Sequence, residues 1–338
     1  ARPPRVMACW VNGTSCTAGR DDNNVHGWGT HGAVPVGSDG RPACAHRRRA
    51  YAPRMAELTD DPANEGRHAP GDERYWNESW YLDFVSDDGR LGGYVRTGLY
   101  PNLGVCWYWA CVVGEGRPLV TLWTDYVVET PWEHVSLGLE GFGVTVDDPA
   151  APLRVRDPRD LRGERTPIGF ELDWETEGSA YPFPFGITRY EVPCRVHGEI
   201  LVGEERIEFS GSGQRDHSWG VRDWWAMSHN WCEGALADGT RFHGTHSLPG
   251  WGDFSIGYVQ QPGGAPVDEL NAYRTEPDFD ADQQPTRAHM AFSAPEPGLD
   301  LEVEVVAHSP VLLVSPDGDE SRFPRSMVRY READGRTG

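Results

Sequence analysis

The sequence predicts an all-β protein whose antiparallel strands form two barrel or sandwich lobes with few short helices. Glycine (40) and proline (27) are abundant among the 338 residues, which favours many short strands joined by turns. Several segments alternate apolar and polar residues with a period of two, the pattern of half-buried strands. The 14 tryptophans supply large apolar surfaces, so we expect them to form a core or to enclose an apolar ligand.

The first strands follow one another as hairpins. Residues 80–85 alternate, the Asp-Asp-Gly at 87–89 predicts a turn, and 93–100 predicts the returning strand. Residues 105–113 contain no charge, so this strand is expected to be covered on both faces. Residues 119–128 alternate again after a glycine-containing turn.

Later hairpins carry equally clear signals. Residues 232–236 and 241–247 are separated by Asp238-Gly239, a strong two-residue turn signal. Residues 301–306 alternate before the Pro-Asp-Gly turn at 316–318. The prolines of 181–186 exclude a central strand, so this segment is expected to cover a barrel mouth or an exposed sheet edge.

The chain is expected to divide into three parts. The Pro/Arg/Asp-rich stretch 149–165 reads as a long loop or linker and predicts a boundary between an N-terminal β lobe at 55–160 and a C-terminal β lobe at 161–338. Residues 1–54 lack a sustained strand or helix period. We interpret them as a disordered tail or as a mis-assigned extension before a start at Met55.

Composition excludes several classes of function. The net charge of −21 argues against nucleic acid or an anionic membrane as a partner, since both require a basic face. All 31 basic residues are arginine, which excludes a lysine Schiff base and a lysine-dependent phosphate loop. The sequence contains no apolar stretch of membrane-spanning length and no signal-peptide pattern. Seven cysteines without a CxxC pair predict free thiols in a reducing cytoplasm.

One motif, residues 211–225, predicts a site. It contains two acids, two arginines, one histidine and three tryptophans, with glycines that allow the backbone to bulge. On an extended backbone His217 and Trp219 share one face, while Asp216 and Ser218 share the other. We therefore expect His217 and Trp219 to face a cavity, with His217 in acid–base catalysis and Trp219 as an apolar or cation-stabilising wall.

The remaining charges of this motif complete the hypothesis. Asp216 or Asp223 is expected to orient the imidazole and act with it, or to pair with Arg215 and Arg222 near the substrate. Trp224 is placed among the substrate-binding residues. The alternative is that the motif only locks a strand corner through buried ion pairs.

Other candidate residues lie outside this motif. Trp107 and Trp109 are expected to line a pocket or to pack in the core, and His246 is a further candidate for substrate binding. His243 and His246 point to opposite faces of one strand. A zinc site combining them with His217 and His229 is conceivable, but surface histidines are expected instead, and no metal or cofactor is predicted.

At this motif a resemblance appears. The Gln-Arg-Asp-His-Ser-Trp-Gly run at 214–220 resembles the Asp-His-x-Trp-Gly signature of the carotenoid hydratase (hydroxyneurosporene synthase) and AttH-like superfamily. Residues 77–84 and 98–104 are similar to runs in an uncharacterised actinobacterial family with paired domains of unknown function. The resemblance covers about residues 72–338 and implies two lipocalin-like β-barrel halves. The superfamily includes Diels–Alderase-type cyclases.

The resemblance also implies a chemistry, in which His217 and Trp219 match the motif and a later acid protonates an isolated double bond. Residues 241–246 lack the expected Tyr-x-Asp, so Asp216, Asp223 or Asp253 would have to supply the proton. The resulting hypothesis is an enzyme, of the hydratase/lyase or isomerase kind, that acts on a terpenoid, steroid or lipid-like molecule by proton-driven hydration, isomerisation or cyclisation. The alternative is a non-catalytic carrier of a hydrophobic ligand. The sequence does not specify the oligomeric state.

Overall fold

The computed structural model describes residues 8–13, 15–17, 61–127, 140–226, 228–247, 254–263, 268–294 and 298–332. These residues form β-strands and a few 3-10 helices, with no α-helix among them, so the predicted all-β class is confirmed. None of the helical segments in this part of the chain has the length and hydropathy of a membrane span. The short 3-10 helices are η1 (Pro62–Glu65), η2 (Pro101–Leu103), η3 (Ala151–Arg154) and η4 (Pro158–Asp160).

The first sheet closes into an eight-stranded antiparallel barrel. Its strands pair in the order β3-β4-β5-β6-β7-β8-β10-β11, and β11 pairs back with β3 to complete the ring. A two-residue strand, β9, pairs antiparallel with the start of β10. The bounds are β3 (Trp76–Ser86), β4 (Leu91–Tyr100), β5 (Val105–Gly114), β6 (Arg117–Val127), β7 (Glu140–Val146), β8 (Glu164–Thr176), β9 (Tyr181–Pro182), β10 (Thr188–Val202) and β11 (Glu205–Val221).

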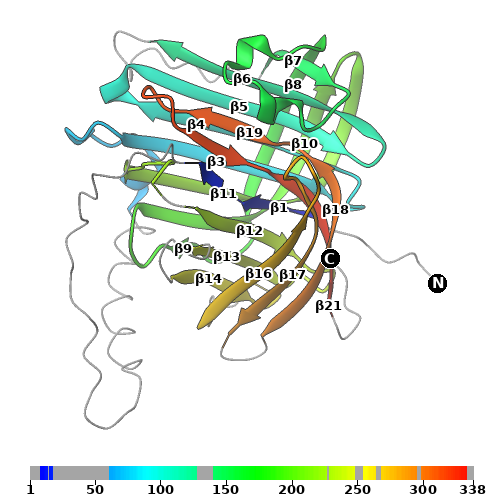
Figure 1. The fold of residues 1–338 in the computed structure, drawn as a ribbon. Helices are drawn as coiled ribbons and strands as arrows, with labels where there is room; N and C mark the ends of the chain where they lie inside the picture. Colours follow the sequence, from blue (N-terminus) through cyan, green and yellow to red (C-terminus); the bar gives the residue numbers. More distant parts are fainter. Residues whose placement is uncertain are drawn as a thin grey trace.

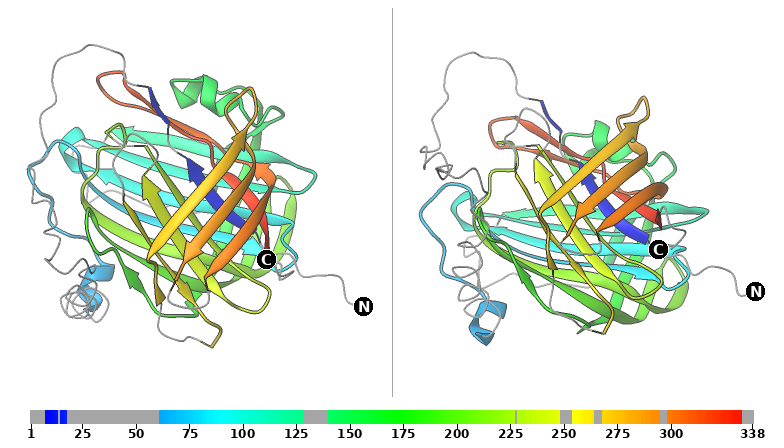
Figure 2. Two further views of the ribbon diagram at one scale, coloured as in Figure 1. Left: turned by 60° about the horizontal axis from the view of Figure 1, so that its bottom comes forward. Right: turned by 90° about the horizontal axis from the view of Figure 1, so that it is seen from below.

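The second sheet is strongly curved and packs against the first barrel (Figure 1). Its nine strands follow the order β15-β14-β13-β12-β1-β21-β18-β17-β16. In Figure 2 its yellow-to-orange strands run across the cyan strands of the barrel. The bounds are β1 (Ala8–Gly13), β12 (His229–Ala235), β13 (Arg241–Ser247), β14 (Ser255–Gln260), β15 (Asp268–Glu269), β16 (Ala272–Phe279), β17 (Pro285–Ser293), β18 (Leu299–His308) and β21 (Ser326–Glu332). A small sheet joins β19 (Val311–Val314), β20 (Glu320–Phe323) and β2 (Ser15–Thr17).

The predicted division of the chain differs from this topology in two places. β8, β10 and β11 all belong to the first barrel, so the break between the two large sheets falls between Val221 and His229 instead of near residue 160. The loop at 149–165 joins β7 to β8, which pair with each other, so its composition marked a long loop and no change of sheet. Residues 8–13 form a strand between β12 and β21, where no strand was predicted. The rest of residues 1–54, with Met55, lies outside the described residues apart from β2.

Strand β5 forms a wall between two cores, which confirms that it is covered on both faces. Tyr108, Ala110 and Val112 point into the barrel and join its core. Trp107, Trp109 and Cys111 point outward and pack with residues of the second sheet and of the small sheet. A third core fills the concave side of the second sheet. The protein therefore has one compartment inside the barrel and another between the barrel and the second sheet.

Candidate functional site

A cavity of about 570 Å³ lies between the barrel and the second sheet. Strands β3, β4, β5, β10 and β11 contribute one wall, and β12, β13 and β14 contribute the facing wall. The segment between β9 and β10, which contains Phe183 and Phe185, borders the cavity as well. This volume suits a small molecule of moderate size.

Most of the cavity lining is apolar or aromatic. Trp109 and Trp224 lie on the barrel side, and Trp231 and Ile256 lie on the side of the second sheet. Phe185 and Val221 line the cavity while keeping 44% and 40% of their surfaces exposed, so they mark its rim. The predicted cover at 181–186 therefore forms part of this rim.

The arginine and aspartate side chains of the lining are four arginines and two acids: Arg96, Arg189, Arg222, Arg325, Asp216 and Asp223. This excess of cations stands in a chain whose net charge is −21. Burial, together with the charges of Arg189 and Arg96, lowers the pKa of Arg222 to about 9. The cavity is thus an electropositive, largely apolar space.

Arg96 lies between two indole rings. Its guanidinium carbon is 4.6 Å from the ring centre of Trp109 and 5.4 Å from that of Trp224. Neither terminal nitrogen of Arg96 has a hydrogen-bond partner among the described residues, and the same holds for the indole N–H of Trp109. A Cβ on Gly98 would lie 2.5 Å from an Arg96 nitrogen, so the glycine makes room for this side chain. Buried donors of this kind require acceptors, which a bound molecule can supply.

Asp216 belongs to a buried ion-pair network at the cavity wall. Arg189 donates to Asp216 Oδ2 over 2.7 Å and to Glu191 Oε1 over 2.7 Å. Glu191 also accepts from the side-chain amide of Gln214 over 2.7 Å and from the indole of Trp231 over 3.2 Å. Burial raises the pKa of Asp216 to about 6, against the opposing charge of Arg189. A carboxyl group of this kind exchanges protons near neutral pH.

The structure places part of the predicted residues in this cavity. Asp216, Asp223, Arg222, Trp109 and Trp224 line it. Trp224 donates its indole N–H to the Tyr100 hydroxyl over 2.5 Å, and the guanidinium of Arg222 lies 4.5 Å from the Trp224 ring centre.

The other predicted residues lie elsewhere. Trp107 packs against Tyr100 and Trp225 in the core. Arg215 pairs with Glu65 over 2.9 Å. His246 contacts the Ser247 carbonyl and the Tyr273 ring. Asp253 lies outside the described residues.

His217 and Trp219 share a face of β11, as predicted, but that face is turned away from the cavity. His217 pairs across the sheet with Tyr190 and Trp80, and Tyr190 belongs to the core inside the barrel. Trp219 packs against the same core. Neither residue lines the cavity between the two sheets, because strand alternation gives that side of β11 to Asp216 and Ser218.

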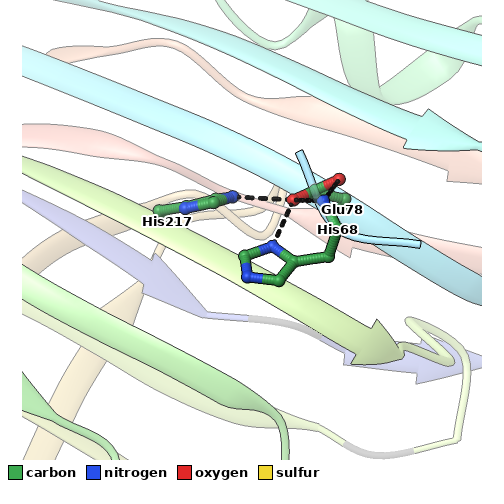
Figure 3. A group of neighbouring side chains, drawn as sticks. All are labelled: His68, Glu78 and His217. Atoms are coloured by element: carbon green, nitrogen blue, oxygen red, sulfur yellow. Dashed lines mark hydrogen bonds and ion pairs between the residues drawn. The ribbon is translucent and has the colours of Figure 1, made fainter. Parts of the chain in front are cut away.

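Inside the barrel His217 meets two residues that the sequence did not single out as a site. Its Nε2 lies 3.0 Å from Glu78 Oε1, and His68 Nδ1 lies 2.8 Å from the same oxygen (Figure 3). Of the described residues, these three form the one group whose potential metal-ligating atoms all lie within 4.8 Å of one another. The sequence did not reveal this cluster, because the partners of His217 come from β3 and from the segment before it.

Several cavity residues were also missed by sequence reasoning. Arg96 is a charge inside the otherwise uncharged run 91–100, and a strand with buried residues on both faces has to place that charge in a polar pocket. Arg189 and Glu191 alternate with apolar residues in β10, and this alternation is a sequence signal that could have identified them. Their pairing with Asp216 depends on the β10–β11 register, which the sequence alone does not specify.

Comparisons with known proteins agree with this architecture. Residues 61–338 match the model of a family described as Domain of unknown function (DUF7064). The match covers most of the chain, so the protein belongs to this family. None of the curated proteins matches the sequence significantly.

The similar solved structures are distant in sequence. A protein from Nitrosomonas europaea, described as an AttH, superposes with a TM-score of 0.52 at 13% identity, over 82% of this chain and 93% of that chain. Kievitone hydratase from Nectria haematococca gives a TM-score of 0.43 at 11% identity, over 74% and 88%. CghA gives 0.43 at 12% identity, over 77% and 88%. The first likeness shows an AttH-like fold, which agrees with the resemblance found in the sequence.

Proposed function

We propose that this member of the DUF7064 family binds a small molecule with an apolar body and an anionic or strongly hydrogen-bond-accepting group in the cavity between its two sheets. The observation that carries the proposal is the Arg96–Trp109 pair: both residues line the cavity, and their buried N–H groups have no acceptor among the described residues. A carboxylate, phenolate or enolate oxygen of a ligand satisfies such donors, and the aromatic walls accommodate the rest of the molecule.

The charge of the cavity supports the same class of ligand. Three buried arginines and the partly buried Arg222 face two acids of the lining, and Arg189 is already engaged by Asp216 and Glu191. A purely hydrocarbon ligand would leave this excess of positive charge buried and uncompensated, which is costly. Lipid-like and polycyclic molecules that carry an acidic or carbonyl oxygen satisfy both the apolar and the cationic parts of the wall.

The proposed activity is proton transfer to or from this ligand, with Asp216 as the acid–base group. Asp216 lines the cavity, and Arg189 fixes one of its oxygens. Hydration, isomerisation and cyclisation all need a proton delivered to, or removed from, a carbon held in an apolar site. Arginines around the polar group of the ligand stabilise negative charge that develops on its oxygen. His217 has no part in this step, because it faces the inside of the barrel.

Binding is tested with two fluorescent probes of similar shape. 8-Anilinonaphthalene-1-sulfonate carries a sulfonate, and N-phenyl-1-naphthylamine has the same rings without it. We expect the purified protein to bind the sulfonate probe at least 10-fold more tightly than the neutral probe. Equal affinities, or preference for the neutral probe, would remove the anionic group from the proposal.

Catalysis is tested by untargeted mass spectrometry of small molecules extracted from the wild type and from Asp216→Asn. We expect both proteins to retain a ligand, with an unreacted precursor accumulating in the variant. The same molecule in both preparations would favour the carrier hypothesis over the enzyme. His217→Ala serves as a comparison and is expected to retain the ligand pattern of the wild type.

A further inference from the structure

We propose that His68, Glu78 and His217 form a binding site for a divalent transition-metal ion, separate from the ligand cavity. The three side chains come together where residues 61–68 pack against β3 and β11 (Figure 3). His68 Nδ1 and His217 Nε2 approach the same oxygen, Glu78 Oε1, over 2.8 and 3.0 Å. When a tetrahedral metal holds its ligands at bonds of about 2.0–2.1 Å, donor atoms lie about 3.3 Å apart, which is close to this spacing.

In each imidazole one nitrogen faces Glu78 and the other faces an oxygen of Asn64. His217 Nδ1 lies 2.8 Å from the carbonyl oxygen of Asn64, which only accepts, so Nδ1 carries the proton. The Tyr190 hydroxyl is a more distant neighbour of the same nitrogen, at 3.4 Å. Nε2, next to Glu78, is therefore the nitrogen of His217 that is placed for a metal ion.

His68 repeats this arrangement. Its Nε2 lies 3.2 Å from Asn64 Oδ1, an acceptor, so Nδ1, 2.8 Å from Glu78, is the nitrogen placed for a metal ion. The backbone N–H of His68 donates to both Glu78 oxygens, over 3.1 and 3.2 Å, and fixes the carboxylate. His68 Nδ1 and His217 Nε2 thus both lie next to one oxygen of Glu78, and a metal ion bound by these three atoms would replace the two direct contacts. Metal-ligating histidines commonly donate their other N–H to a carbonyl oxygen, as both rings do here.

Aromatic stacking holds the ligating rings in place. Trp219 stacks on His68 at 3.7 Å between ring centres with an interplanar angle of 11°, and Trp80 stacks on His217 at 4.6 Å and 15°. The side chains of His217 and Glu78 are 1% and 0% exposed, and that of His68 is 21% exposed. His68 is thus the most exposed of the three proposed ligands.

The ligand set selects the kind of ion. Two imidazoles and one carboxylate suit Zn²⁺, Fe²⁺, Co²⁺ or Ni²⁺, whereas Mg²⁺ and Ca²⁺ prefer sites made of oxygen ligands alone. Three protein ligands with an open fourth position are also the composition of metal sites that bind an exchangeable ligand. The role of Trp219, His217 and the start of β3 is therefore to build a metal centre inside the barrel.

The test uses the full-length untagged protein after treatment with EDTA. Co²⁺ is titrated in and followed by its visible d–d absorption, and Zn²⁺ affinity is measured by competition with the bound Co²⁺. We expect one equivalent to bind to the wild type, and affinity to fall at least about 100-fold in His68→Ala and in Glu78→Gln. The matched control is His289→Ala, which removes an exposed histidine that pairs with Asp300 on the second sheet.

Thermal unfolding gives a second readout that does not depend on activity. Zn²⁺ is expected to raise the melting temperature of the wild type and of His289→Ala, and to leave that of His68→Ala unchanged, because only a metal-binding native state is stabilised. Absence of stoichiometric binding to the wild type, or undiminished binding in both ligand variants, would overturn the proposal and leave the cluster as an ion pair. Should Glu78→Gln fail to fold, the partly exposed His68 still decides the question through His68→Ala and His68→Gln.

Discussion

The guanidinium of Arg96 stacks on the indole of Trp109, with 4.6 Å between the guanidinium carbon and the ring centre, and both residues line the same cavity while their buried N–H donors lack acceptors in the described part of the chain. Burying a cation among aromatic rings without hydrogen-bonding partners is unfavourable for the stability of the fold. The pair is better suited to recognising a ligand than to stabilising the fold.

Arg96→Met is expected to separate these two roles. Methionine fills a similar volume without a charge, so we expect the free energy of unfolding to fall by no more than about 1 kcal/mol, or to rise. The affinity for the sulfonate probe should fall by at least 10-fold, since a hydrogen bond to a charged group contributes about 1.5–3 kcal/mol. Urea unfolding and probe titration measure the two effects. Arg287→Met, at an exposed position on β17, is the control. A large loss of stability with unchanged probe affinity would make Arg96 structural.

The cavity rim gives a second prediction. Phe185→Ala removes an apolar group that is 44% exposed, so stability should change by less than about 0.5 kcal/mol. Affinity for both fluorescent probes should fall several-fold because the ring borders the cavity. Phe279→Ala is the matched control, since Phe279 is 47% exposed and lies on β16, away from the cavity lining. Equal effects of the two substitutions on probe binding would contradict this assignment of the rim.

Arg215 and Arg222 provide a third test, because both belong to the motif at 211–225. Arg215 pairs with Glu65 at the surface, whereas Arg222 lines the cavity. We expect Arg215→Met to leave probe affinity unchanged and to cost less than about 1 kcal/mol of stability, as partly exposed ion pairs do. Arg222→Met should weaken binding of the sulfonate probe by several-fold. The reverse ranking of the two variants would show that the cavity is not the binding site of the probe.

Asp83 makes the stability depend on pH. Asp83 lies on β3 and is fully buried. Burial, with a contribution from the charge of Glu191, raises its pKa to about 8, although the backbone N–H of Gln214 and the charge of Arg325 act in the opposite direction. A carboxyl group whose pKa is raised on folding keeps its proton in the native state after it has lost it in the unfolded state. Its contribution to stability is therefore present below about pH 4 and is lost progressively as the pH rises to about 8.

Asp83→Asn removes this dependence, because the amide stays neutral. Between pH 5 and pH 8 the wild type should lose at least about 1 kcal/mol more stability than the variant, as measured by urea unfolding at each pH. An identical pH profile for the two proteins would mean that Asp83 is ionised in the native state. Other buried acids such as Glu233 add their own pH dependence to both proteins, so the difference between the profiles is the informative quantity.

Local pattern in the sequence was sufficient to predict the hairpins and the doubly covered strand at 105–113, because both depend on residues near one another in the chain. The same alternation correctly separated His217 from Asp216. It did not show which face of β11 meets the second sheet, since that depends on the packing of two separate sheets. Glu78 and His68 were missed because they lie on β3 and in the segment before it, far from His217 in the sequence. The composition of 149–165 did not distinguish a long loop from a change of sheet, because both have the same composition.

The alternation of β11 has a consequence for the evolution of the molecule. This strand is a partition between two compartments, and the parity of each position decides which compartment its side chain enters. Asp216 enters the intersheet cavity, and His217 enters the barrel. Deletion of one residue upstream within β11 would exchange the two sets of side chains, so that the histidine entered the cavity and the acid entered the barrel. The strand can therefore vary by substitution on either side independently, whereas a change in its length alters both compartments at once.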